Sequence, residues 1–280
     1  MAGCHDVPGF SSTPPPGRNQ LRPYTDNMPN NNQQWNIPPA DLHLTGDTVH
    51  VWLARVDRYP LAIGNGRPVL SADEQAKAAR FYFERDRQRY AAAHSVLRIL
   101  LGRYMDCDPL AIRFCTNSYG KPAIDAPRQE HTLTFNLSHS HELALYAFTY
   151  DRALGVDVES MRSNIEYEQL ARHSFSLNEQ QALRELPDDA KQQGFFNGWT
   201  RKEAYIKARG MGLSLPLHLF DVSLKPGEPA ALLASREDAR EAARWTMRAL
   251  APGPDYAGAL CVEDEGWELA CYEFTSPNLH

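Results

Sequence analysis

Hydrophobic and polar positions divide the chain into an unpatterned beginning and a patterned remainder. Residues 1–40 are dominated by Pro, Asn, Gln, Gly and Ser, a composition that cannot bury enough apolar area to offset the entropy of ordering the backbone. We therefore expect a disordered tail over this segment. From residue 48 onward, apolar residues such as Val49 and Val51 alternate with neighbours that face the other way, which is the period of a half-buried strand.

Spacing typical of helices appears in three later stretches. Ser71 stands where a helix N-cap is expected. Residues 80–104 carry apolar side chains three and four positions apart, which predicts one long helix or two abutting helices. The same spacing predicts helices over residues 177–186 and 194–209.

Strand-like runs are grouped together instead of alternating with these helices. Three follow a turn at residues 119–122, and one or two more close the chain. They lie over residues 132–137, 143–149, 154–158 and 257–274. Grouped strands beside separate helices indicate an α+β fold.

Composition and charge narrow the class of protein. Hydrophobic residues at 42% and charged residues at 23% are close to globular averages, and the formal net charge of −6 argues against a general nucleic-acid binder. No stretch approaches the roughly 20 apolar residues needed to cross a bilayer, and the first residues lack the pattern of a signal peptide. The five cysteines contain no CxxC pair, so we expect reduced thiols, with Cys261 and Cys271 as small buried hydrophobes, in a cytoplasmic protein.

Two acidic residues stand close together in Gly155-Val156-Asp157-Val158-Glu159. If this segment is a strand, Asp157 and Glu159 share one face, because side chains two positions apart point the same way. A pair of carboxylates suits a hard cation such as Mg²⁺, which usually also binds substrate phosphates. The alternative is an edge strand with a solvated acidic face.

Residues 199–207 bring an aromatic, a carboxylate and an ammonium to helical spacing. On a helix, Glu203 and Lys207 lie one turn apart on the same face as Trp199. The alternative is an ordinary surface ion pair.

A third polar segment runs over residues 135–141, at the end of one predicted strand and the start of a turn. Its histidines, His139 and His141, together with His131, raise the question of a zinc site. No further Cys or His lies at fitting spacing, and nearby carboxylates favour a harder ion. The alternative is a polar turn.

Taken together, the three segments read Phe-Asn-x-Ser-His-Ser, then Gly-x-Asp-x-Glu, then Trp-x-x-Lys-Glu-Ala-x-x-Lys. In this order and spacing they resemble the 4′-phosphopantetheinyl transferases of the Sfp type. The resemblance covers about residues 48–275 and includes the segments at 119–122 and 212–216, with no departure at the core motif positions.

The resemblance implies a pseudo-dimer of two similar α+β subdomains with the active site in the cleft between them. By similarity, the N-terminal subdomain spans residues 48–150 and the C-terminal subdomain spans residues 151–280. A chain with both halves is expected to act as a monomer. Its substrates would be coenzyme A and an apo acyl or peptidyl carrier protein, with neither nucleic acid nor a membrane as partner.

The resemblance also implies roles for single residues. Asp157, Glu159 and Glu203 match the Mg²⁺-binding acids, and the charge of the bound metal would stabilise the leaving adenosine 3′,5′-bisphosphate. Glu203 resembles the base that activates the carrier serine, directly or through a water. Lys207 matches a catalytic lysine on the pyrophosphate. Residues expected to bind coenzyme A are Lys77, Arg80, Arg85, Arg89, Gly120, Lys121, Ser138, His139, Asp157 and Lys207.

Two other functions stay open at the level of sequence. The three acids would equally serve another Mg²⁺-dependent phosphotransferase or phosphodiesterase, although no Walker loop or Gly-rich kinase loop is present. A carrier-binding module without turnover is the non-enzymatic alternative. It would hold apo carrier protein without any gain in carrier mass on addition of coenzyme A.

Overall fold

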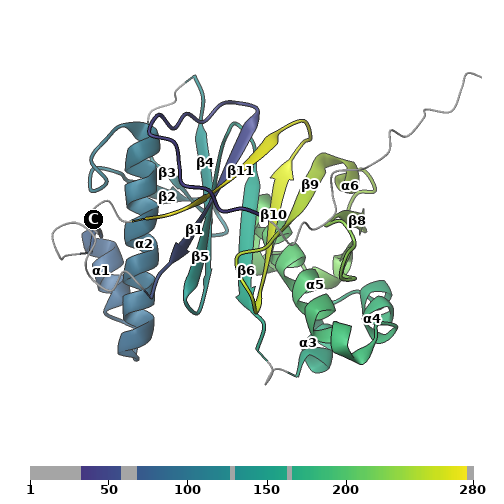
Figure 1. Cartoon of the computed structure of the whole chain (residues 1–280). Coiled ribbons are helices and arrows are strands. Elements are labelled where there is room, and N and C mark those ends of the chain that lie inside the picture. The colour runs from purple at the N-terminus through teal and green to yellow at the C-terminus, as the bar shows by residue number, and fades with distance from the viewer. Residues whose placement is uncertain (1–32, 58–67, 127–129, 163–165, 276–280) are drawn as a thin grey trace, which may run out of the picture.

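The centre of the molecule is built from two small sheets, each with its own long helix (Figure 1). The computed structural model describes residues 33–57, 68–126, 130–162 and 166–275. Within this part of the chain no helix combines the length and apolar character needed to cross a membrane. The α+β fold with two subdomains is confirmed.

The first sheet has the strand order β11-β1-β5-β4. β1 is antiparallel to β5 but parallel to β11, which returns from the end of the chain to the N-terminal half. Its strands are β1 (Thr48–Arg55), β4 (Leu133–Ser140), β5 (Leu143–Tyr150) and β11 (Glu268–Glu273), and its helices are α1 (Ala72–Ala78) and α2 (Glu84–Met105). The hairpin of β2 (Phe114–Thr116) and β3 (Pro122–Ile124) stands beside it.

The second sheet has the order β6-β10-β9 and packs against helix α5 (Asp188–Arg209). Its strands are β6 (Leu154–Ser160), β9 (Trp245–Leu250) and β10 (Tyr256–Glu263). Around it lie α3 (Tyr167–Ser174), α4 (Leu177–Arg184), α6 (Glu241–Arg244), the pair β7 (Phe220–Val222) and β8 (Leu232–Ser235), and 3-10 turns at Gly212–Ser214 and Leu217–Leu219.

Alternation along the strands produces four layers, in the order helix, sheet, sheet, helix. Trp52 of β1 packs toward the α2 core, whereas Val51 joins the apolar layer between the two sheets. In β6, Val156 enters the layer between the sheets, so residues with the opposite direction, including Asp157, face away from that layer. The alternation that predicted a half-buried β1 therefore describes a strand covered on both faces.

The two sheets meet at their edge strands, β4 and β6, through side chains. Every second side chain of β4 accepts a hydrogen bond from a backbone N–H of β6. The pairs are Val156 to Asn136 (2.9 Å), Val158 to Ser138 (3.4 Å) and Ser160 to Ser140 (3.2 Å). These bonds satisfy edge groups that would otherwise be left unpaired, and they fix the register of the two strands.

Most predicted elements are present, but several boundaries are shifted, and helix α2, expected from residue 80, begins at Glu84. The third polar segment belongs to β4 as far as Ser140, because its polar side chains bond β6, and the turn shrinks to residues 141–142. Helix α5 begins at Asp188 and not at Gly194. Its first turn is polar, which hides the apolar spacing, but Pro187 at the N-cap and two acidic residues suit a helix start. Helix α3 and strand β9 were not predicted.

Part of the predicted tail lies within the described residues. Asn36 pairs with Tyr272 next to β11, and the Trp35 indole donates to the Ala251 carbonyl at 2.8 Å. Residues 1–32 lie outside the described residues, so the disordered tail stays a prediction. Cys261 and Cys271 are buried, as predicted.

Candidate active site

Strand β6 and helix α5 approach each other very closely at Gly155. A Cβ atom at this position would lie 2.2 Å from the carbonyl oxygen of Ala204 and 2.4 Å from the amide nitrogen of Ala208. Only glycine allows this contact between backbones. Because Asp157 and Glu159 share the face of Gly155, the contact brings both carboxylates toward α5.

Asp157 lies at the centre of the site and is 2% exposed. Its Oδ1 accepts hydrogen bonds from Lys207 Nζ at 2.6 Å and from Ser138 Oγ at 2.8 Å. Its Oδ2 is buried and has no hydrogen-bond partner among the described residues. Asp157, Ser138 and Lys207, which come from β6, β4 and α5, therefore lie in one cluster.

The other two predicted metal ligands stand close to Asp157. Glu159 accepts a hydrogen bond from Ser140 Oγ at 2.8 Å, and burial followed by the charge of Asp157 raises its pKa above the usual value. Burial, with the charges of Asp157 and Glu159, raises the pKa of Glu203 to about 7. The charge of Asp157 thus disfavours the ionised forms of Glu159 and Glu203.

The described residues do not form a complete set of metal ligands. Among the described residues, no three His, Cys, Asp or Glu side chains gather closely enough to hold an ion. The chemistry of the acidic cluster nevertheless fits Mg²⁺, because its ligands are oxygens and the Asp157 Oδ2 has no partner. No zinc site forms either in this part of the chain, and His131 instead pairs with Asp151 at 2.6 Å.

Helix α5 is held in place by Lys202, a motif residue to which the sequence assigned no role. Its side chain is fully buried and forms an ion pair of 2.8 Å with Glu179 of α4. Its Nζ also donates to the carbonyls of Leu217 and Phe220, each at 2.7 Å. Lys202 therefore points away from the site and fixes the helix that carries Glu203 and Lys207.

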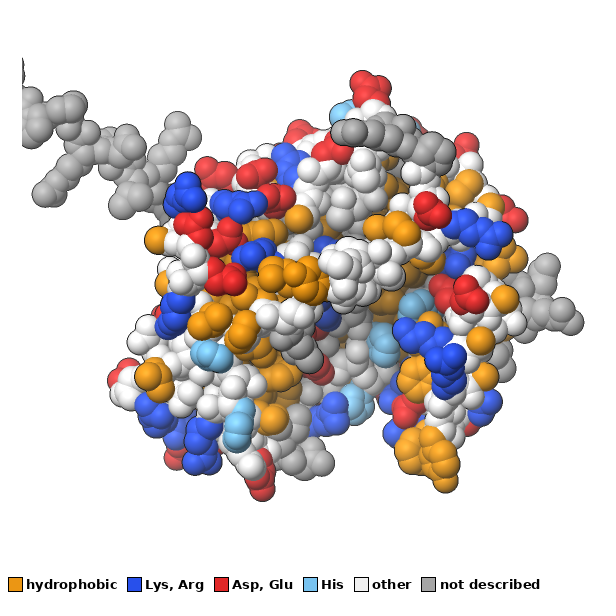
Figure 2. All heavy atoms as spheres, turned by 180° about the vertical axis from the view of Figure 1, so that it is seen from behind, with side chains coloured by type: hydrophobic (Ala, Val, Ile, Leu, Met, Phe, Trp, Pro, Cys, Tyr) orange, Lys and Arg blue, Asp and Glu red, His pale blue; other side chains and the backbone are white. Residues whose placement is uncertain are grey.

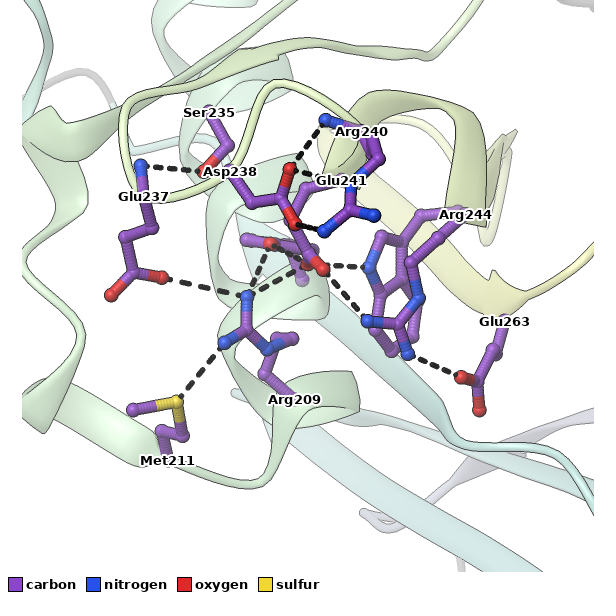
Figure 3. A network of polar contacts seen from close by, with 11 residues as sticks. Arg209, Met211, Ser235, Glu237, Asp238, Arg240, Glu241, Arg244 and Glu263 are labelled. Atoms are coloured by element: carbon purple, nitrogen blue, oxygen red, sulfur yellow. Dashed lines mark hydrogen bonds and ion pairs between the residues drawn. The ribbon is translucent and has the colours of Figure 1, made fainter.

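The C-terminal end of α5 is fixed by a second network (Figure 3). The buried carboxylate of Glu241 accepts hydrogen bonds of 2.8 Å from Arg209, from the Tyr205 hydroxyl and from Arg244, and one of 3.0 Å from the Trp245 indole. This network fixes the last turn of α5 against α6 and β9.

A cavity of about 550 Å³ opens beside the acidic cluster, and Lys207 lines its wall. From behind, the surface is hollowed between two lobes, and histidine and basic side chains lie along the margins of the hollow (Figure 2). Both halves of the chain line the cavity. Predicted residues in its wall are Lys77, Gly120, Lys121, His139 and Lys207.

Lys121 and His139 are held at the wall in different ways. The Lys121 ammonium donates to the carbonyls of Leu154 (2.9 Å) and Ala208 (3.2 Å), and burial lowers its pKa to about 8. His139 borders the open cavity, where surrounding protein atoms and nearby positive groups, including Lys207, lower its pKa. Gly120 has a φ of +87°, so the turn at the cavity rim favours glycine.

The basic residues of the N-terminal half are only partly brought together. Lys77 lines the cavity and stands 5.4 Å from the centre of the Tyr90 ring. Arg89 is near enough to lower the pKa of His139, whereas Arg85 lies 3.6 Å from Asp86. Neither Arg85 nor Arg89 lines the cavity, and nor does the exposed Arg80.

Several wall residues were missed by sequence reasoning. The Tyr90 and His94 rings are tilted against each other with centres 4.1 Å apart, and both line the cavity. Glu74 completes this wall, bound to Arg98 at 2.6 Å and 3.5 Å from His94. Tyr90 and His94 lie one turn apart in the predicted helix over residues 80–104, next to the basic cluster, and this spacing was the available signal.

Comparisons with known proteins agree with this geometry. A family model described as the 4′-phosphopantetheinyl transferase superfamily matches residues 153–261, and a model described as the N-terminal part of 4′-phosphopantetheinyl transferases matches residues 65–150. The two models cover the strand and helix of the acidic cluster and most of the opposite cavity wall.

Single relatives are similar over most of the chain. The 4′-phosphopantetheinyl transferase HetI of Nostoc sp. is 38% identical over 234 residues, which cover 84% of this chain and 95% of HetI. The 4′-phosphopantetheinyl transferase Sfp of Bacillus subtilis is 35% identical over 55% of this chain and 66% of its own. A 4′-phosphopantetheinyl transferase of Bacillus pumilus is 30% identical over 70% of this chain and 80% of its own. The chain therefore belongs to the 4′-phosphopantetheinyl transferase family, and it is a transferase of that type.

Proposed function

We propose that this enzyme transfers the 4′-phosphopantetheine group of coenzyme A to a serine of an acyl or peptidyl carrier protein, in a Mg²⁺-dependent reaction that releases adenosine 3′,5′-bisphosphate. The supporting observation is the position of Lys207, which both lines the cavity and bonds Asp157. The cavity volume of about 550 Å³ falls in the range usual for cofactor sites, and Lys77 and Lys121 in its wall suit phosphates.

Glu203 is proposed as the general base. The serine hydroxyl attacks the β-phosphorus of coenzyme A, and the bond from that phosphorus to the bridging oxygen breaks, so that adenosine 3′,5′-bisphosphate leaves. Glu203 takes the serine proton directly or through a water. Its pKa of about 7 suits this role, because a base works best when its pKa lies near the working pH.

The metal would be held by Asp157, Glu159 and Glu203. Bound Mg²⁺ supplies charge stabilisation to the phosphate oxygens and the leaving group. On the protein side, Ser138 and Ser140 position two of these acids through hydrogen bonds of 2.8 Å. Lys207 provides a further positive charge toward the pyrophosphate.

Coenzyme A is proposed to lie between the two halves, residues 48–150 and 151–280. The family models meet between residues 150 and 153, which supports this division, although β11 returns to the sheet of the first half. Lys77, Lys121, His139 and the Gly120 turn would contact its phosphates and adenine from the cavity wall, with Arg80, Arg85 and Arg89 as further candidates for the 3′-phosphate. We also propose a cytoplasmic monomer.

The test is an intact-mass measurement on apo carrier proteins of fatty-acid, polyketide and peptide synthases, with coenzyme A and Mg²⁺. A mass gain equal to one phosphopantetheine, together with adenosine 3′,5′-bisphosphate, is expected for at least one carrier. Asp157→Ala should abolish the gain, whereas Asp189→Ala, an exposed aspartate at the far end of α5, should leave it unchanged. Binding of carrier without mass gain would refute the proposal, and so would release of another nucleotide product.

A further inference from the structure

The ammonium of Lys207 is surrounded by oxygen atoms at the centre of the acidic cluster. Its Nζ donates to Asp157 Oδ1 at 2.6 Å, to Ser138 Oγ at 3.0 Å and to the Val156 carbonyl at 3.4 Å. The Asp157 carboxylate is buried, whereas the Lys207 side chain keeps 28% of its surface exposed. The lysine thus neutralises a buried carboxylate from the open side of the site.

The ammonium lies beside the carboxylate oxygen that a metal ion would use. Asp157 is a proposed Mg²⁺ ligand, and its Oδ1 already carries the lysine while its Oδ2 has no partner. Among the described residues no group of three metal-binding side chains is assembled. An ammonium on Oδ1 and a divalent cation on Oδ2 of the same buried carboxylate would lie close enough to repel each other strongly. Metal binding and the Lys207–Asp157 ion pair are therefore in competition.

The cavity offers space for the Lys207 ammonium when it leaves Asp157. Its side chain lines the cavity of about 550 Å³, where the phosphates of the donor are proposed to lie. A lysine carries its charge on a flexible four-carbon stem, so the ammonium can exchange partners while the helix stays in place. The helix itself is fixed, because Lys202 and Arg209 hold it on either side of Lys207.

We propose that Lys207 is an exchangeable counter-cation: it neutralises Asp157 in the free enzyme and passes to the pyrophosphate of coenzyme A when the metal takes its place. This inference rests on the proposed function and adds an order of events to it. When coenzyme A is absent, Mg²⁺ must displace Lys207 from Asp157, and the lysine gains no new anionic partner. Metal and coenzyme A together exchange one ion pair for another, so each should strengthen the binding of the other by the same factor.

The test is calorimetric titration of MgCl₂ into the full-length enzyme without carrier protein, so that no turnover occurs. For the wild type we expect Mg²⁺ to bind about tenfold more tightly with saturating coenzyme A than without it, within the range of about 5–150-fold usual for coupled sites. Lys207→Met should bind Mg²⁺ about tenfold more tightly than the wild type when coenzyme A is absent. In this variant, the factor by which coenzyme A tightens Mg²⁺ binding should fall toward one.

Lys225→Met is the matched control, because Lys225 is an exposed lysine outside the site. It should bind Mg²⁺ like the wild type. If Lys207→Met does not fold, as judged by its circular dichroism and thermal midpoint, Lys207→Gln removes the same charge and should give the same tightening.

Two results would overturn the exchange. One is Mg²⁺ binding by the neutral variants that is no tighter than that of the wild type without coenzyme A. The other is wild-type Mg²⁺ affinity that does not respond to coenzyme A. Either result, combined with a normal mass gain on the carrier, refutes the exchange and leaves the proposed transfer standing. Absence of any mass gain with the wild type refutes the transfer itself.

Discussion

Replacing Gly155 by alanine would test how the contact between β6 and α5 builds the site. The new methyl carbon would lie 2.2 Å from the carbonyl oxygen of Ala204 and 2.4 Å from the amide nitrogen of Ala208. Both atoms belong to the backbone of a helix that is buried on most sides, so neither can rotate away. Because contacts with carbon settle near about 3.5 Å, the strand and the helix would have to separate by about 1 Å.

Two losses follow from this separation. Forcing an extra methyl group into a packed core usually costs about 1–3 kcal/mol, and a clash with rigid backbone places Gly155→Ala at the upper end of that range, about 3 kcal/mol. The separation also moves Lys207 and Glu203 away from Asp157. A misplacement of about 1 Å in a catalytic site can lower the rate about 10²-fold, so we expect a loss of that size in kcat/KM even where the variant is folded.

The measurements are urea unfolding and carrier-protein mass gain under initial-rate conditions. Gly46→Ala is the control, because nothing lies within 4 Å of a Cβ at that position. Its stability should stay within about 0.5 kcal/mol of the wild type. A Gly155→Ala enzyme with wild-type stability and rate would refute the close approach of β6 and α5.

Three further predictions concern the interior of α5 and the N-terminal segment of the chain. Glu203→Gln should lower kcat about 10²–10⁴-fold. Since the folded pKa of Glu203 is raised from 4.5, its proton stabilises the metal-free fold fully below pH 4.5, and that contribution is lost as pH rises through about 7. The glutamine variant should therefore gain stability over the wild type at pH 8 but not at pH 4, and equal gains at both would contradict the shifted pKa. Lys202→Met should destabilise the fold by about 3–5 kcal/mol in urea, because Glu179 is left buried without its partner, and a cost under about 1 kcal/mol would refute the buried pair. Deletion of residues 1–40 should lower the thermal midpoint more than deletion of residues 1–32, because residues 33–40 contact the C-terminal strands, and equal midpoints would contradict that docking.

Local sequence patterns were sufficient for most of the elements. Alternating apolar residues predicted β1, strand-like runs predicted β4, β5 and β6, and helical spacing predicted α2, because such patterns reflect only which sides of an element meet a core. The same periodicity placed Glu203 and Lys207 on one face of α5 and Asp157 and Glu159 on one face of β6. These relations hold within a single element, so no knowledge of packing was needed.

Tertiary structure decided the relations between elements. Lys207 meets Asp157 across 50 residues of chain, and β4 side chains replace a backbone ladder to β6, which no local period encodes. The motif glycine Gly155 and the motif lysine Lys202 have structural roles that their spacing could not reveal, since one depends on a helix backbone 2.2 Å away and the other on a carboxylate in α4. Burial is a property of the assembled layers. The sequence alone therefore determined which candidate groups share a face of one element, and packing determined which of them touch and how their charges are balanced.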